Sequence, residues 1–149
     1  MKHAERRILQ KTILLLLSAA TIGFIFSNSM ETIPESSAKS EELLCVLTPA
    51  LELFIGKGNA TNHLIRKLAH YAEFFVLGTE LCLLCSLLKK KVWGLFAGLC
   101  TALTDETIQI LYERGAQLQD VWLDFSAVVT SAVLVFLCGV ITKRGKDRT

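Results

Sequence analysis

The sequence predicts an all-α integral membrane protein, a bundle of four transmembrane helices that forms one domain over residues 1–149. Hydrophobic residues other than glycine make up 52% of the chain, already above the usual share in soluble proteins. Charged residues, at 20%, are grouped in short blocks between long apolar stretches, as expected where charges must stay out of lipid. A formal net charge of only +2, without a basic face that carries interleaved aromatics, argues against nucleic acid as a partner.

Four apolar segments are predicted to span the membrane, at about residues 12–27, 68–88, 92–111 and 121–141. The last three approach the ~20 residues with which a helix crosses ~30 Å of hydrocarbon. The first is shorter, so Lys11 at its inner end must extend its ammonium group toward water. Its basic start and short apolar run also fit a cleaved signal peptide. No clear cleavage site of small residues follows it, which favours a retained helix.

The lysines and arginines predict the orientation of these spans. Eleven of the 16 basic residues lie in the N-terminal tail, in the link between the second and third spans, and in the C-terminal tail. Basic residues concentrate on the cytoplasmic side of a membrane. We therefore expect both termini to be cytoplasmic. The link between the first and second spans and the link between the third and fourth spans should face outward.

The long outer link, residues 28–67, is predicted to contain an amphipathic helix. Ser40, followed by two glutamates, is typical of a helix start, and Gly56 is expected to end the helix. Pro49 would kink this helix or mark its first turn. Its apolar residues recur at helical spacing: Leu43, Leu47, Leu51 and Phe54. Such a helix could lie in the outer interface, re-enter the membrane, or cap the mouth of the bundle.

Charged and amide residues interrupt the predicted spans only near their outer ends, with Glu80 as the deepest exception. Arg66, His70 and Glu73 lie at positions i, i+4 and i+7 and therefore share one face of the second span, with Lys67 beside them. The outer parts of the other spans and their link add the remaining candidate ligand-binding residues: Ser27, Asp105, Glu106, Gln109, Arg114, Asp120 and Asp124. Because ionisable groups in hydrocarbon are costly and tend to mark function, this clustering predicts an outward-facing site.

The residue types in this cluster permit more than one kind of binding. His70, Glu73 and an acid of the third span could hold a divalent metal, although no specific metal motif supports this. Arg66, Lys67 and Arg114 could instead hold an anionic head group.

Catalysis is also open, so the sequence leaves it undecided whether the protein is an enzyme. The candidates for acid–base catalysis are His70, Glu73, Glu106 and Asp120. A purely structural network that fixes the register of the helices is the alternative. Transport is disfavoured, because a transporter site is expected near the midplane, where only Glu80 lies. That glutamate is expected to need a partner or a proton.

Three stretches of the chain, RKLAHYAEFFVLG, TDETIQ and RGAQLQDVWLDFSAV, resemble the VanZ-like family of bacterial membrane proteins. The family pattern combines a Phe–Ser pair, Lys–x–x–His–x–x–Glu, Asp–Glu–x–x–Gln, and Arg followed by Asp–x–x–x–Asn–x–x–Gly. This chain matches it at Phe26, Ser27, Lys67, His70, Glu73, Asp105, Glu106, Gln109, Arg114 and Asp120. It departs at Asp124, which adds a charge in place of Asn, and at Ala127, which replaces a glycine.

The resemblance implies a multi-pass protein of the bacterial cytoplasmic membrane that acts at its outer face. The implied partners are a membrane lipid, a lipoglycopeptide or a lipid-linked cell-wall precursor. A contribution to teicoplanin resistance or to envelope homeostasis is the implied role. The alternative is a membrane-embedded enzyme that acts on a lipid-linked envelope substrate through a His/Glu/Asp site.

Overall fold

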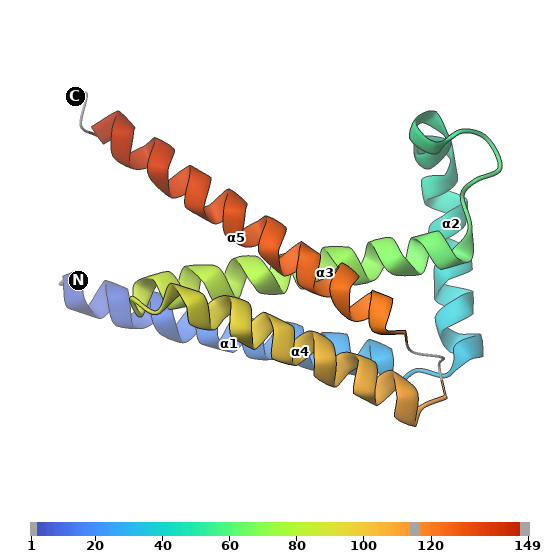
Figure 1. Cartoon of the computed structure of the whole chain (residues 1–149), viewed down its shortest axis with the longest axis horizontal. Helices are drawn as coiled ribbons and strands as arrows, with labels where there is room; N and C mark the ends of the chain where they lie inside the picture. Colours follow the sequence, from blue (N-terminus) through green and yellow to red (C-terminus); the bar gives the residue numbers. More distant parts are fainter. Residues whose placement is uncertain (1–2, 114–116, 147–149) are drawn as a thin grey trace.

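The computed structural model describes residues 3–113 and 117–146, and these residues form helices and no strand. The helices are α1 (His3–Ser29), α2 (Ile33–Ile55), α3 (Asn62–Leu87), α4 (Lys91–Leu111) and α5 (Leu118–Lys146). Helices α1, α3 and α4 run alongside one another, and α2 lies across one end of them (Figure 1). Helix α5 starts near α2 and diverges from the others toward its C-terminal end (Figure 1). The chain therefore forms a bundle with one capped end and one end that opens.

Three of the helices, α1, α3 and α5, are long and apolar enough to cross a membrane. They coincide with three of the predicted spans, of which only Leu88 lies outside its helix. Helix α4 covers the remaining predicted span with 21 residues. The mean hydropathy of α4 is lower than that of a typical membrane span, because Asp105, Glu106 and Gln109 lie in its C-terminal half. Those three side chains are buried within the bundle, so they lower the hydropathy of α4 without facing its surroundings.

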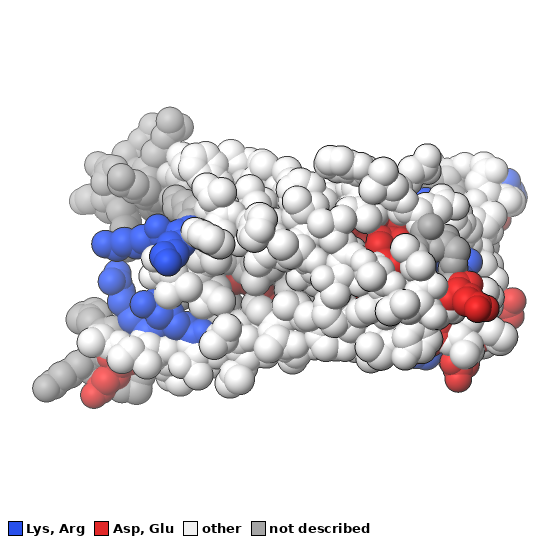
Figure 2. Space-filling view, turned by 60° about the horizontal axis from the view of Figure 1, so that its bottom comes forward, with Lys and Arg blue, Asp and Glu red and all other residues white. Residues whose placement is uncertain are grey.

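The outer surface of the bundle is largely apolar. Large hydrophobic side chains are exposed on several helices, among them Leu16, Phe96 and Phe136. Figure 2 shows a broad zone almost free of charged residues on the visible face, with lysines and arginines gathered at the end where α1 begins and acidic groups mostly at the opposite end. A continuous apolar surface of this extent is typical of a lipid-facing protein.

Helix α3 is the centre of the fold, because it packs against each of the other four helices. The buried core takes Ile25 from α1, Phe74 and Leu77 from α3, Ala102 from α4 and Val128 from α5. The two C-terminal helices and α1 thus contact a shared layer of side chains that α3 supplies.

Two glycines let α3, α4 and α5 approach closely around Val128. A Cβ at Gly78 would lie 2.8 Å from Val128 Cα, and a Cβ at Gly98 would lie 2.6 Å from the Val128 side chain. Both distances are shorter than carbon atoms tolerate, so only glycine fits at either position. The close approach expected of a glycine at position 127, where this chain has a buried alanine, is supplied here by glycines on the facing helices.

Helix α2 begins earlier than predicted. The predicted start at Ser40 is wrong, because the helix begins at Ile33 after an N-cap at Thr32. The Glu35 carboxylate accepts hydrogen bonds from the backbone N–H of Thr32 at 2.9 Å and from its hydroxyl at 2.8 Å. This reciprocal cap satisfies donors that a helix start leaves open. The predicted end is confirmed, since Gly56 follows the helix with a φ of +86°.

The apolar face of α2 points away from the bundle. Helix α2 packs on α3, yet Leu43, Leu47 and Phe54 remain exposed, and Phe54 is 88% exposed. Pro49 lies inside the helix and does not start it. The segment between α1 and α3 is therefore an amphipathic helix with exposed apolar side chains.

Candidate functional site

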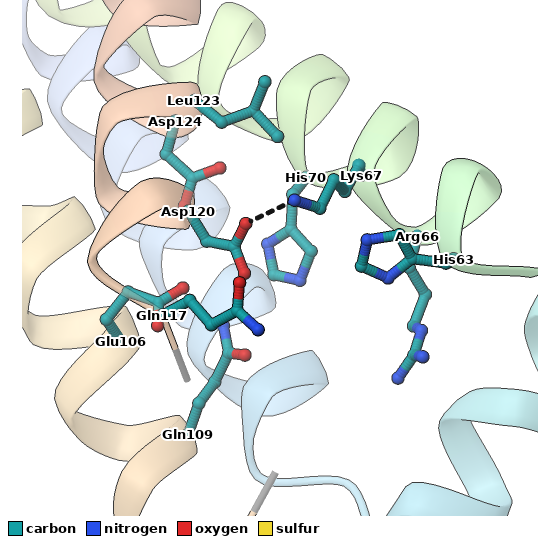
Figure 3. Close-up of a pocket in the computed structure, with 10 residues that line it drawn as sticks. All are labelled: His63, Arg66, Lys67, His70, Glu106, Gln109, Gln117, Asp120, Leu123 and Asp124. Carbon is teal, nitrogen blue, oxygen red and sulfur yellow. Dashed lines mark ion pairs between the residues drawn. The ribbon is translucent and has the colours of Figure 1, made fainter. Parts of the chain in front are cut away.

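A polar pocket opens between α3, α4 and α5 at the end of the bundle next to α2. Its volume is about 200 Å³, and charged or amide side chains of all three helices point into it (Figure 3). Seven of the predicted site residues line this pocket: Arg66, Lys67, His70, Glu106, Gln109, Asp120 and Asp124. The helical spacing read from the sequence therefore placed most of the cluster on the correct helix faces.

The cations of the pocket come from α3. Lys67 Nζ lies 2.9 Å from Asp120 Oδ1 and so joins α3 to α5 (Figure 3). Arg66 makes no ion pair with residues that the structure describes, and its Nε is buried without a hydrogen-bond partner among them. Arg114, a further predicted cation, lies outside the described residues. Arg66 is thus the cation best placed to accept an anion.

A hydrogen-bonded carboxylate lies behind the pocket. Asp105, which is 0% exposed, accepts hydrogen bonds from Ser29 Oγ at 2.5 Å and from Gln109 Nε2 at 2.9 Å. Its Oδ2 lies 3.8 Å from His70 Nδ1. Residues of α1, α3 and α4 are therefore connected through a single buried side chain, which fixes the position of Asp105.

Two other buried carboxylates have fewer partners. Asp124 is 1% exposed, and neither of its oxygens has a hydrogen-bond partner among the described residues. Glu106 accepts a hydrogen bond from the backbone N–H of Gln117, while its Oε2 is buried without a partner in the same part of the chain. Such groups are costly unless a cation, a proton or a ligand satisfies them.

The structure groups His70 with carboxylates other than the predicted Glu73. One ligand atom each from His70, Asp105 and Asp124 lies within 4.8 Å of the others. Glu73 accepts a hydrogen bond from Asn28 of α1 at 2.8 Å and does not line the pocket. The structure therefore does not bring Glu73 to this trio, because its carboxylate is directed toward Asn28 of α1.

Glu80, one heptad further along α3, has a hydrogen-bond partner, as expected from the sequence. Thr21 Oγ1 of α1 donates to Glu80 Oε1 at 3.1 Å. Together with the bond from Asn28 to Glu73, this contact holds α1 against α3. These two half-buried carboxylates thus join α1 to α3 and lie outside the pocket.

The structure places Ser29, and not Ser27, at the cluster. Ser27 is exposed and donates to the carbonyl of Phe24 in its own helix at 2.7 Å, whereas Ser29 is fully buried against Asp105. The two serines lie about 200° apart around the helix. A signal was present in the sequence, since Ser29 follows the buried Ile25 by four residues on the same face.

Three pocket residues were not anticipated: His63, Gln117 and Leu123. His63 lies three residues before Arg66 and seven before His70, so the helical spacing of that face could have found it. Gln117 begins the described chain after the link from α4 and gave no such signal.

An apolar bundle with a polar pocket at one end fits a helical membrane protein whose candidate binding site lies at that end of the bundle. The model of the VanZ/LLP1 family matches residues 12–139. The chain therefore belongs to this family, as its motifs predicted, and the matched region contains every residue of the pocket. No curated protein matches the chain, and no solved structure matches it.

Proposed function

We propose that this protein is a multi-pass protein of the bacterial cytoplasmic membrane that binds the anionic head group of a membrane amphiphile at the outer face. The observation that carries the proposal is the polar pocket at one end of an otherwise apolar bundle. Its volume of about 200 Å³ is below the 300–1,000 Å³ typical of sites for drug-sized ligands. A head group fits such a pocket, while acyl chains stay on the apolar exterior.

The proposed topology has four spans, with α4 as the additional one. The polar residues of α4 are turned into the bundle, so its remaining surface is suited to lipid. The end where α1 begins and α5 ends (Figure 1) would be cytoplasmic, because it carries the basic residues that accumulate there. Helix α2 would then lie in the outer interface with Leu43, Val46 and Phe54 toward the lipid.

The proposed ligand class follows from the charges of the pocket. Arg66 has no competing ion pair in the described structure, and a guanidinium group binds a phosphate in a bidentate manner. A phospholipid or a lipid-linked cell-wall precursor presents such a phosphate. A lipoglycopeptide is larger than the pocket and could insert only one polar group. A contribution to teicoplanin resistance or envelope homeostasis is proposed on the family resemblance alone.

Binding to nanodisc-embedded protein tests this proposal. We expect labelled phosphatidylglycerol to bind the native protein at least tenfold more tightly than the Arg66→Gln variant. Arg7→Gln is the matched control, because Arg7 is an exposed arginine of α1 at the opposite end of the bundle, and it should bind as the native protein does. Equal binding by Arg66→Gln, or no binding above empty nanodiscs, would overturn the proposal. Teicoplanin measured in parallel tests the lipoglycopeptide.

An enzyme that acts on a lipid-linked substrate is the second candidate function. The position of Asp105, held by Ser29 and Gln109 and 3.8 Å from His70, favours it, because an oriented carboxylate can fix a histidine for acid–base work. We expect His70→Ala to abolish phosphate release from a lipid-linked pyrophosphate while head-group binding persists. Absence of turnover by the native protein would eliminate this candidate.

A further inference from the structure

We propose that His70, Asp105 and Asp124 bind one divalent transition-metal ion of the zinc type at the base of the pocket. The three side chains come from α3, α4 and α5, respectively. Their ligand atoms lie within 4.8 Å of one another, and His70 Nδ1 and Asp105 Oδ2 are 3.8 Å apart. Residues that are 35 and 19 positions apart in the chain are thus brought to one point by the packing of three helices.

The spacing is close to that of a formed metal site. Two ligand atoms bound to one zinc ion at ~2.1 Å in tetrahedral geometry lie about 3.4 Å apart. The atoms of this trio therefore need to approach one another by roughly 1 Å or less on average, which side-chain rotation provides. His70 and Asp124 also line the pocket. A fourth coordination position would consequently face the pocket, as in zinc sites that bind a further ligand.

Asp124 provides the independent observation. It is buried to 99%, and neither carboxylate oxygen has a hydrogen-bond partner among the described residues. The charged groups that act on it are four further carboxylates: Asp105, Glu106, Asp120 and Glu73. The nearby Lys67 is already paired with Asp120. A buried carboxylate among carboxylates requires positive charge, and a metal ion held by Asp124 supplies it.

The surroundings of Asp105 also fit a ligand. Ser29 donates to one of its oxygens at 2.5 Å and Gln109 to the other at 2.9 Å. Metal-binding carboxylates are usually held by such outer hydrogen bonds, which fix their orientation. A set of one imidazole nitrogen and two carboxylates suits zinc and its neighbours, whereas calcium and magnesium prefer oxygen ligands alone.

The metal itself is the probe, so the test does not depend on the head-group proposal. The full-length protein is purified in detergent, stripped with a chelator and titrated with Zn²⁺ against a chromophoric chelator. We expect one ion per chain, with affinity at least tenfold weaker in Asp124→Asn and in His70→Ala. Glu80→Gln is the matched control, because Glu80 is a carboxylate of α3 that accepts from Thr21 and lies outside the pocket, and it should stay within about threefold of the native affinity.

Three results would overturn the metal site. The first is that the native protein binds no stoichiometric Zn²⁺, the second is an unchanged affinity in Asp124→Asn, and the third is an equal loss of affinity in Glu80→Gln. If a variant fails to fold, two measurements on the native protein decide. Zn²⁺ should raise its melting temperature, and Co²⁺ should give the absorption bands of nitrogen and oxygen ligation; absence of both would reject the site. Metal binding with unchanged lipid binding in Arg66→Gln would uphold this inference while rejecting the proposed function.

Discussion

The half of the bundle next to α2 and its middle layer are built from the same helices but are held together in different ways. At the end next to α2, the three helices α3, α4 and α5 meet through charged and amide side chains around Asp105. In the middle of the bundle they meet through what we call the glycine layer, in which Val128 packs between Gly78 and Gly98. Buried ionic groups contribute little net stability, whereas close packing stabilises helices in lipid. The glycine layer therefore keeps the helices close enough to enclose a polar pocket that is itself costly.

Beyond the glycine layer the contact between helices weakens again. Helix α5 leaves α3 and α4 toward its C-terminal end (Figure 1), and an apolar groove of about 550 Å³ opens between them, lined by Cys82, Leu95 and Phe136 among others. The tightest packing of all three helices is thus at Gly78 and Gly98, while α3 and α4 also approach closely at Gly94. Substitutions in the glycine layer should therefore cost at least as much stability as substitutions in the polar half.

The largest expected effect is at Gly78. In Gly78→Ala the new Cβ would lie 2.8 Å from Val128 Cα, so α3 and α5 must separate. We expect the free energy of unfolding to fall by about 3 kcal/mol, measured by thermal or denaturant unfolding in detergent. Gly23→Ala is the control, because a Cβ there meets no atom within 4 Å; it should leave stability unchanged or slightly raised. Equal stability of the two variants would contradict the role of the glycine layer.

Within the polar half, two aspartates should respond differently to the same truncation. Asp105→Ala removes the acceptor of two buried hydrogen bonds and should lower the free energy of unfolding by about 2–3 kcal/mol. Asp124→Ala, in chelator, removes a carboxylate without hydrogen-bond partners and should leave stability unchanged or raise it by ~1 kcal/mol. Calorimetry of both variants under the same conditions measures the difference. A larger loss in Asp124→Ala would mean that Asp124 has a structural role.

A smaller effect is expected where α1 joins α3. Thr21→Val keeps the size of the side chain but removes the donor to Glu80, which should cost about 1 kcal/mol of stability. Thr12→Val serves as the comparison, because the exposed Thr12 hydroxyl donates only to the Ile8 carbonyl of its own helix. Unfolding curves that coincide for the two variants would show that the bond between the helices contributes nothing.

The smallest effect should be at the N-terminus of α2, outside both halves. The backbone N–H and hydroxyl of Thr32 donate to the Glu35 carboxylate and lower its pKa. A lowered pKa means that the cap is intact at neutral pH and is lost as the pH falls through the folded-state pKa of Glu35. Protection of the first amides of α2 against hydrogen exchange, relative to the intrinsic rate at each pH, should therefore fall in acid. Glu35→Gln, which removes the titrating carboxylate, should abolish that pH dependence. Global unfolding should not change.

Much of the fold could be predicted from local pattern. Each predicted span coincides with a helix of the structure, apart from Leu88, which lies one residue beyond α3, because a run of apolar residues has no other favourable arrangement in lipid. The end of α2 was likewise predicted at Gly56, a residue that adopts the positive φ found there. The start of α2 was missed, since Ser40 with its glutamates resembles a cap, while the cap that the structure uses is Thr32, eight residues earlier, with Glu35.

The sequence by itself determined which residues share a helix face, because the 3.6-residue period fixes their angular positions. On that basis Arg66 and His70 were placed correctly in one pocket. Only the tertiary structure decided which faces meet. The close approach of α3, α4 and α5 at Gly78 and Gly98 sets how each helix is rotated against its neighbours. That rotation turns Glu73 toward α1 and brings His70, Asp105 and Asp124 together, and no period within one helix specifies it.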